Sequence, residues 1–278
     1  IQNLITQNVD AILIANCSSM DAKVDLVQQA RSKGIGVYNL DNQVVEGVLA
    51  NATMPNGVAA MELIYAIGAD TTWNANVGTI AAKSVQAQIE RTYPMEGMMN
   101  GVYPNFKLLA SEDMGDSTNP SQTAFDFGET WLQKYGDDLD VIIGAADIIG
   151  IGCAEAIIKN GDEHGENTIC AGLDGGSQAW SYIRKDTPFK YSYAQPFEAY
   201  AHNIMELIDE LQVQGMKPGD DGCLISEEGA AIYETGMVVS PKNVPEVGES
   251  IHAVFDYYGG DPEDADAWYN WTDGEGAY

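Results

Sequence analysis

Short apolar runs alternate with longer amphipathic stretches along most of the chain. Apolar runs of strand length occur at residues 11–15, 36–40, 141–144 and 168–172. The amphipathic stretches repeat apolar residues every three or four positions, as Val24, Val27 and Ala30 do, which is the spacing of one helix face. Strands that alternate with helices of about ten to fifteen residues predict βαβ units and a parallel sheet. We therefore expect an α/β fold.

Carboxylate and amide side chains follow three of these strands. Asp41 and Asn42 follow the second apolar run, Asp147 follows the third and Asp174 follows the fourth. In open α/β sheets, ligands bind beyond the carboxyl ends of the strands, so these residues are candidate ligand-binding groups. Asp and Asn also serve as helix caps and turn residues, and the pattern leaves that alternative open for each position taken singly.

Length and charge narrow the class of protein. The 278 residues correspond to about two domains. The chain has 42 acidic and 13 basic residues, a formal net charge of −29. Nucleic acid and anionic membrane surfaces both attract basic proteins, so this charge argues against either as a partner. No apolar run approaches the roughly 20 residues of a membrane-spanning helix.

The common catalytic and cofactor motifs are absent from the sequence. Its three histidines show no metal-site spacing, and there is no His-Glu-x-x-His motif. Neither a Gly-x-Ser-x-Gly nucleophile motif nor a Walker-type phosphate loop occurs. We therefore expect no cofactor and no metal site, and not an enzyme.

Five segments resemble, in the same order, motifs of the type I periplasmic binding proteins, the ribose- and galactose-type sugar-binding proteins of ABC transporters. The first two read Asn-Val-Asp-Ala-Ile-Leu-Ile and Ala-Arg-Ser-Lys-Gly-Ile-Gly-Val-Tyr-Asn-Leu-Asp. The five segments are residues 8–14, 30–41, 140–152, 170–175 and 193–196. The resemblance spans residues 1–244 and is specific to the superfamily, not to one ligand.

The resemblance implies two doubly wound parallel-sheet domains joined by a three-strand hinge. The pattern along the chain then places residues 1–75 and 196–225 in an N-terminal-type lobe, and residues 76–195 and 226–244 in a C-terminal-type lobe. Residues 245–278 form an acidic, aromatic tail. Members of the family begin with a βαβ unit that this sequence lacks, so we expect an N-terminal truncation of the gene product or of the sequence given.

The resemblance also implies a set of ligand-binding positions. These are Asp41, Asn42, Arg91, Met114, Asp147, Asp174 and Gln195. The sequence departs from the family pattern in three places. Asn42 stands where ribose-type proteins have an arginine, Ala146 where they have an asparagine, and Met114 where an aromatic residue is frequent.

The function implied is that of an extracytoplasmic solute-binding protein, periplasmic or a cell-surface lipoprotein. Such a protein binds a small molecule, here a sugar, in a cleft between two lobes that close on it, and delivers it to an ABC transporter permease. We expect a monomer that binds no nucleic acid, with its signal segment outside this chain. An alternative from another class stays open: a sensory or regulatory domain of the same fold, either a receptor ectodomain or a LacI-like effector domain.

Overall fold

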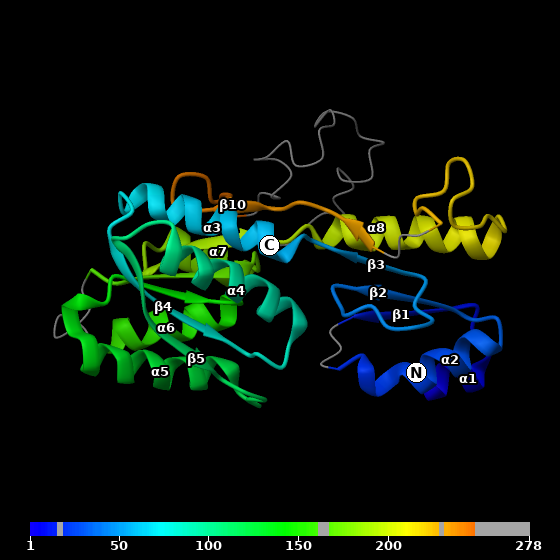
Figure 1. Ribbon diagram of the computed structural model, residues 1–278, viewed down its shortest axis with the longest axis horizontal. Helices are drawn as coiled ribbons and strands as arrows, with labels where there is room; N and C mark the ends of the chain where they lie inside the picture. The colour runs from blue at the N-terminus through cyan, green and yellow to red at the C-terminus, as the bar shows by residue number, and fades with distance from the viewer. Residues whose placement is uncertain (16–18, 161–166, 228–230, 248–278) are drawn as a thin grey trace. The chain divides into compact units, whose positions relative to one another are not determined.

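The computed structural model of the chain describes residues 1–15, 19–160, 167–227 and 231–247 (Figure 1). The predicted acidic tail lies outside the described residues from residue 248 onward. None of the helices in these described ranges is long and apolar enough to cross a membrane.

The chain divides into two compact units, each built from separate segments. Unit 1 comprises Ile1–Pro55, Val85–Ala87 and Pro196–Thr235. Unit 2 comprises Asn56–Ser84, Gln88–Gln195 and the segment from Gly236 onward. Apart from the short excursion at Val85–Ala87, the chain therefore passes from one unit to the other after Pro55, Gln195 and Thr235.

Unit 1 is built on a parallel sheet of four strands in the order β1-β2-β3-β9. The strands are β1 (Ala11–Ala15), β2 (Gly36–Leu40), β3 (Ala50–Thr53) and β9 (Ala231–Tyr233). The helical elements are α1 (Gln2–Gln7), η1 (Asp21–Lys23), α2 (Val24–Ser32), α8 (Phe197–Ile208) and the π-helical turn η4 (Asp209–Val213). Figure 1 shows α1 and α2 on one face of this sheet and α8 on the other.

The predicted helix after β1 forms as α2. Val27 and Ala30 are fully buried and pack with Ile5 and Ile12 in the core of unit 1. Gly34, with a φ of 82°, ends the helix, because the chain must turn through a left-handed conformation there.

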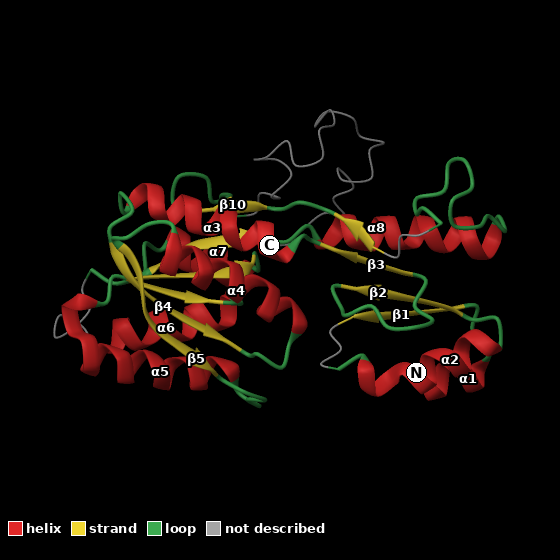
Figure 2. Cartoon of the chain, in the orientation of Figure 1, coloured by secondary structure: helices red, strands yellow, loops and turns green. Residues whose placement is uncertain are grey.

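Unit 2 contains a sheet of six strands in the order β10-β8-β7-β6-β4-β5, parallel except for the antiparallel pair β10–β8. The strands are β4 (Ala75–Ala81), β5 (Phe106–Asp113), β6 (Val141–Gly144), β7 (Ile169–Asp174), β8 (Phe189–Ala194) and β10 (Met237–Val239). The helical elements are α3 (Asn56–Asp70), α4 (Gln86–Gly101), α5 (Pro120–Tyr135), η2 (Gly136–Asp138), α6 (Asp147–Asn160) and α7 (Ser177–Arg184). Figure 2 shows α3 and α4 on one side of the sheet and α5 and α6 on the other.

Helices cover both faces of the unit 2 sheet, which explains why its central strands are apolar. All four residues of β6 are buried, and β6 reads as a continuous apolar run rather than an alternating one. Gly78 on β4 makes room for the Trp131 ring, because a Cβ there would lie 2.3 Å from it. At the start of helix α5, the Asn119 side chain accepts from the Gln122 amide and Pro120 lies in the first turn.

Apart from the short excursion at Val85–Ala87, the division into units differs from the predicted domain boundaries at two places. Residues 56–75 group with unit 2 because α3 packs against β8 and β10. Residues 226–235 group with unit 1 because β9 pairs with β3. In both places long-range packing assigns a segment that local pattern placed in the other unit.

Candidate functional site

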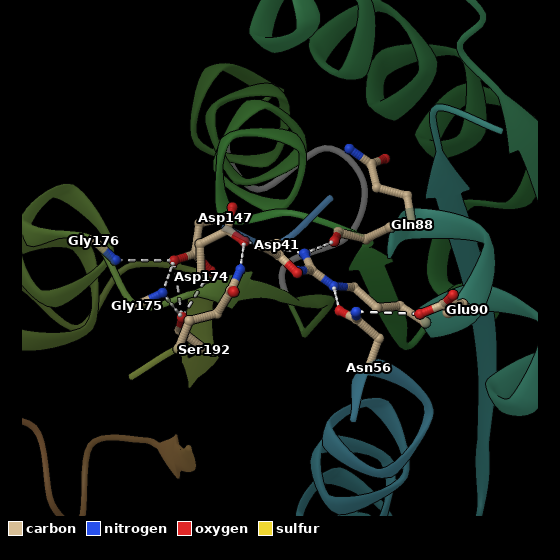
Figure 3. Close-up of polar contacts among 12 residues, drawn as sticks. Asp41, Asn56, Gln88, Glu90, Asp147, Asp174, Gly175, Gly176 and Ser192 are labelled. Carbon is tan, nitrogen blue, oxygen red and sulfur yellow. Dashed lines mark hydrogen bonds and ion pairs between the residues drawn. The ribbon is translucent and has the colours of Figure 1, made fainter. Parts of the chain in front are cut away.

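Polar side chains gather at the carboxyl ends of the central strands of unit 2 (Figure 3). Strand β6 leads to Asp147, β7 ends at Asp174, and β8 leads to Gln195. These strands are adjacent in the sheet, so their ends lie together, as the strand-end pattern requires. Arg91 joins them from α4.

Arg91 is a buried cation with three partners in unit 2. Its Nη1 lies 3.0 Å from Oδ1 of Asp174 and also donates to the carbonyl oxygen of Ala145 at 2.9 Å. Its Nε donates to Oδ1 of Asn56 at 2.8 Å. The side chain of Arg91 is 3% exposed, whereas that of Asp174 is 34% exposed, so the ion pair presents its carboxylate toward solvent.

Gln195 completes this cluster. Its Nε2 donates to Oδ1 of Asp174 at 2.7 Å, so this one oxygen accepts from both a guanidinium and an amide. Gln195 is itself buried. The three residues combine a carboxylate acceptor, guanidinium donors and an amide that can both donate and accept.

Asp147 lies buried under the turn that follows β7. Its Oδ2 accepts from the amides of Gly175 at 2.7 Å and Gly176 at 3.3 Å, and its Oδ1 lies 2.7 Å from Oγ of Ser192 (Figure 3). Burial, and secondly the charge of Asp174, raise the pKa of Asp147 to about 7, against the lowering effect of these hydrogen bonds.

The backbone at this turn adopts conformations that most residues avoid. Asp174 has a φ of 141° and Gly175 a φ of 77°. A Cβ on Gly175 would lie 2.5 Å from Cα of Ala194, and a Cβ on Gly172 would lie 2.6 Å from Cα of Asp147. Glycine at these two positions lets β7, β8 and the start of α6 approach closely.

In unit 1, Asp41 and Asn42 follow β2 as predicted. Asp41 has a φ of 47°, and its Oδ1 accepts from Oγ1 of Thr53 at 2.8 Å. Nδ2 of Asn42 donates to the carbonyl oxygens of Ile14 at 2.8 Å and Leu40 at 2.9 Å. The Asn42 amide group therefore ties the ends of β1 and β2 together.

Met114 and Ala146 lie in the hydrophobic cluster of unit 2. Both side chains are buried, and the cluster also contains Ile80, Ile149 and Ile151. Met114 follows β5, which β4 separates from β6 in the sheet. Its role as a ligand contact stays a prediction, as does that of the other six residues named from the sequence.

Asn56 and Ser192 take part in the cluster, although the sequence did not single them out. Nδ2 of Asn56 donates to Oε2 of Glu90 at 3.3 Å while its Oδ1 accepts from Arg91, so the amide orients the guanidinium. Asn56 comes directly after Pro55 and opens α3, where a short polar residue is normally interpreted as a cap. No local signal distinguishes that role from an interaction with Arg91.

Comparison with known proteins identifies the family of the chain. A family model described as periplasmic binding protein domain matches residues 1–215. No curated protein matches the chain.

Solved structures share the fold across most of the chain. The arabinose binding protein AraP from Geobacillus stearothermophilus matches with a TM-score of 0.74 and 15% identity, covering 91% of this chain and 82% of that one. A galactofuranose binding protein matches at 0.73 and 15%, covering 87% and 79%. A solute binding protein of an ABC transporter from Actinobacillus succinogenes 130z, with bound D-allose, matches at 0.70 and 20%, covering 87% and 82%.

The predicted family and the predicted pair of parallel-sheet α/β domains are thus confirmed. With its strand-end polar cluster and its two-unit architecture, the chain belongs to the periplasmic binding protein family.

Proposed function

We propose that this chain is an extracytoplasmic solute-binding protein of an ABC importer and that its ligand is a neutral sugar or a closely related polyol. The observation that carries the proposal is the Arg91–Asp174–Gln195 cluster at the carboxyl ends of parallel strands. The proposal includes no catalytic step. Because the chain belongs to this family, we also propose that it is a monomer and that its partner is an ABC transporter permease.

The chemistry of the cluster suits a polyhydroxylated ligand. A sugar hydroxyl both donates and accepts, and the cluster offers groups of both kinds. Hydrogen bonds to ionised groups are stronger than those between neutral groups, so the more exposed Asp174 carboxylate can hold a hydroxyl firmly. An analogue lacking one hydroxyl would leave a polar group of the site without a partner, which is a source of specificity.

The names of the similar structures point to the same ligand class. They include proteins named for arabinose and galactofuranose and proteins described with bound D-allose and with bound myo-inositol. All four compounds are uncharged and carry several hydroxyls. The ion pair at the site is compatible with an uncharged ligand, because Arg91 and Asp174 carry opposite charges.

A thermal-shift screen of the full chain tests the proposal. The panel contains pentoses, hexoses, disaccharides, polyols and, as a different class, amino acids. A ligand at 1,000 times its Kd stabilises by about 4 kcal/mol, which at roughly 2–4 °C per kcal/mol is a shift near 10 °C. A shift with a sugar or polyol that is lost in Asp174→Asn is the expected result. A folded chain that responds only to amino acids, or to no compound, would contradict it.

A further inference from the structure

The carboxylate of Asp147 accepts hydrogen bonds on both oxygens from groups of its own unit. Oδ2 accepts from the amides of Gly175 and Gly176, and Oδ1 is within hydrogen-bond distance of the Ser192 hydroxyl. Asp147 is buried, and these partners come from the β7–α7 turn and from β8. Such a group is placed to support the turn above it.

The turn that Asp147 supports is strained. Asp174 is a non-glycine residue with a φ of 141°, and Gly175 follows with a φ of 77°. A backbone in a sparsely populated region persists only where surrounding interactions hold it. The two amide bonds to Asp147 lie immediately after Asp174 and supply such an interaction.

The same turn determines where the Asp174 carboxylate points. That carboxylate accepts from Arg91 and Gln195. It is the most exposed of the three side chains, so a ligand can reach it most easily. A rotation of the backbone at Asp174 would move its Oδ1 away from both donors. The orientation of Asp174 thus depends on Asp147, although the two carboxylates have different partners.

We propose that Asp147 is a positioning residue, which fixes the Asp174 carboxylate in its ligand-binding orientation by holding the amides of Gly175 and Gly176. This inference rests on the proposed function for its effect on affinity. It differs from the interpretation drawn from the sequence, in which Asp147 contacts the ligand itself. The role needs an acceptor oxygen at this place and does not need a negative charge.

Two substitutions separate these requirements. In Asp147→Asn, the amide oxygen can accept from Gly175 and Gly176 while the NH2 group donates to Oγ of Ser192, so the turn keeps its support. In Asp147→Ala, both backbone amides lose the carboxylate, and the Gly175 amide keeps only its longer bond to Oγ of Ser192, at 3.2 Å. Thr168→Val is the matched control: the buried Thr168 hydroxyl donates to the carbonyl oxygen of Leu139 beside the amino end of β7, away from the turn.

The first measurement needs no ligand. Hydrogen exchange at the Gly175 and Gly176 amides, followed by NMR in the full chain, should be faster by about tenfold or more in Asp147→Ala, because each amide loses its bond to a carboxylate. Asp147→Asn should stay within about threefold of the wild type. Thr168→Val should leave both amides unchanged. Unchanged exchange in Asp147→Ala would overturn the proposal.

The second measurement is affinity by calorimetry, with L-arabinose, D-galactose, D-allose and myo-inositol as probes. For the probe that binds the wild type, Asp147→Ala should weaken binding by about tenfold to a hundredfold, and Asp147→Asn should restore it to within about threefold. Equal losses in both variants would mean that the charge contacts the ligand and would overturn the positioning role. If none of these four probes binds the wild type, the full thermal-shift panel decides the proposed function, and the exchange measurement alone decides the positioning role.

Discussion

Both units place an aspartate with positive φ at the carboxyl end of a parallel strand, but they support it differently. In unit 1, Asp41 accepts from the neutral Thr53 hydroxyl, and the neighbouring Asn42 amide bonds to backbone carbonyls. In unit 2, Asp174 pairs with the buried cation Arg91 and itself has a strained backbone, and the next two amides donate to Asp147. Similar strand-end patterns thus gain different partners within each unit: a neutral hydroxyl donates to Asp41, and a buried guanidinium pairs with Asp174.

The difference has an energetic consequence. Groups that are held in place before a ligand arrives lose little freedom on binding, so their bonds contribute more to affinity. Charge-assisted bonds are also stronger than neutral ones. We therefore expect the residues of unit 2 to dominate both affinity and the response to mutation.

The largest effect is expected for Asp174→Ala. It removes the acceptor shared by Arg91 and Gln195 and should weaken sugar binding by about a hundredfold or more. Asp41→Ala, the matched change in unit 1, should weaken it by about tenfold. Calorimetry with the ligand found by thermal shift measures both. A larger loss in Asp41→Ala would reverse the comparison.

The next effect is on stability and comes from Arg91→Met. Arg91 is 3% exposed, and its removal takes one donor from each of Asn56, Asp174 and the carbonyl oxygen of Ala145. We expect the free energy of unfolding to fall by about 2 kcal/mol in urea denaturation, less than for a fully buried pair because Asp174 reaches solvent. Lys159→Met breaks the exposed pair with Glu129 in the same unit and should cost less than about 1 kcal/mol. Equal costs would refute the distinction.

A smaller effect concerns the pH dependence of stability. Burial and the charge of Asp174, which itself pairs with Arg91, raise the pKa of Asp147 to about 7, whereas an unfolded aspartate titrates near 4. Between these values the folded chain holds a proton that the unfolded chain releases. The stabilisation from this proton is therefore complete below pH 4 or so, decreases as the pH rises toward 7, and is absent above it.

Asp147→Asn isolates this contribution. The free energy of unfolding of the wild type, minus that of the variant, should decrease between about pH 4 and 7 by at most about 1.4 kcal/mol per pH unit, and should then become constant. Subtraction cancels the carboxylates that do not interact with Asp147, so the difference reports Asp147 together with the neighbouring Asp174. Urea titrations at four pH values provide the data. A difference that does not change with pH would contradict the raised pKa.

The smallest effect is expected in unit 1. Thr53→Val removes a neutral hydroxyl donor from Asp41 and should cost about 1 kcal/mol of stability or less, with a change in sugar affinity below about fivefold. The hydroxyl of Thr53 is buried, so urea denaturation can resolve the loss. An affinity loss as large as that of Asp174→Ala would show that the Thr53–Asp41 bond matters as much for binding as the contacts of Asp174.

Much of the fold was predictable from local pattern. The apolar runs that we assigned as strands form β1, β2, β6 and β7, and the amphipathic stretch before Gly136 forms α5. The strand-end aspartates also lie where parallel topology puts them. Local pattern succeeded here because central parallel strands are buried on both faces and must be apolar along their whole length.

Local pattern could not assign α3 or β9 to a unit. Helix α3 follows a strand of unit 1 in sequence yet packs on β8 and β10 of unit 2, and β9 pairs with β3, far earlier in the chain. Neither contact has a signature within its own segment. The positions where the chain changes units are thus a property of long-range packing.

The sequence by itself determined the class of the fold, the excess of acidic charge and the polar residues at the strand ends, because these depend on periodicity and composition. Only the tertiary structure decided what each polar residue does. It turned Asp147 toward the β7–α7 turn, gave Asn56 to Arg91, and packed Met114 into the core of unit 2. The physical reason is that a side chain's role depends on its partners in space, and these partners lie 28 and 35 residues away in sequence for Asp147 and Asn56.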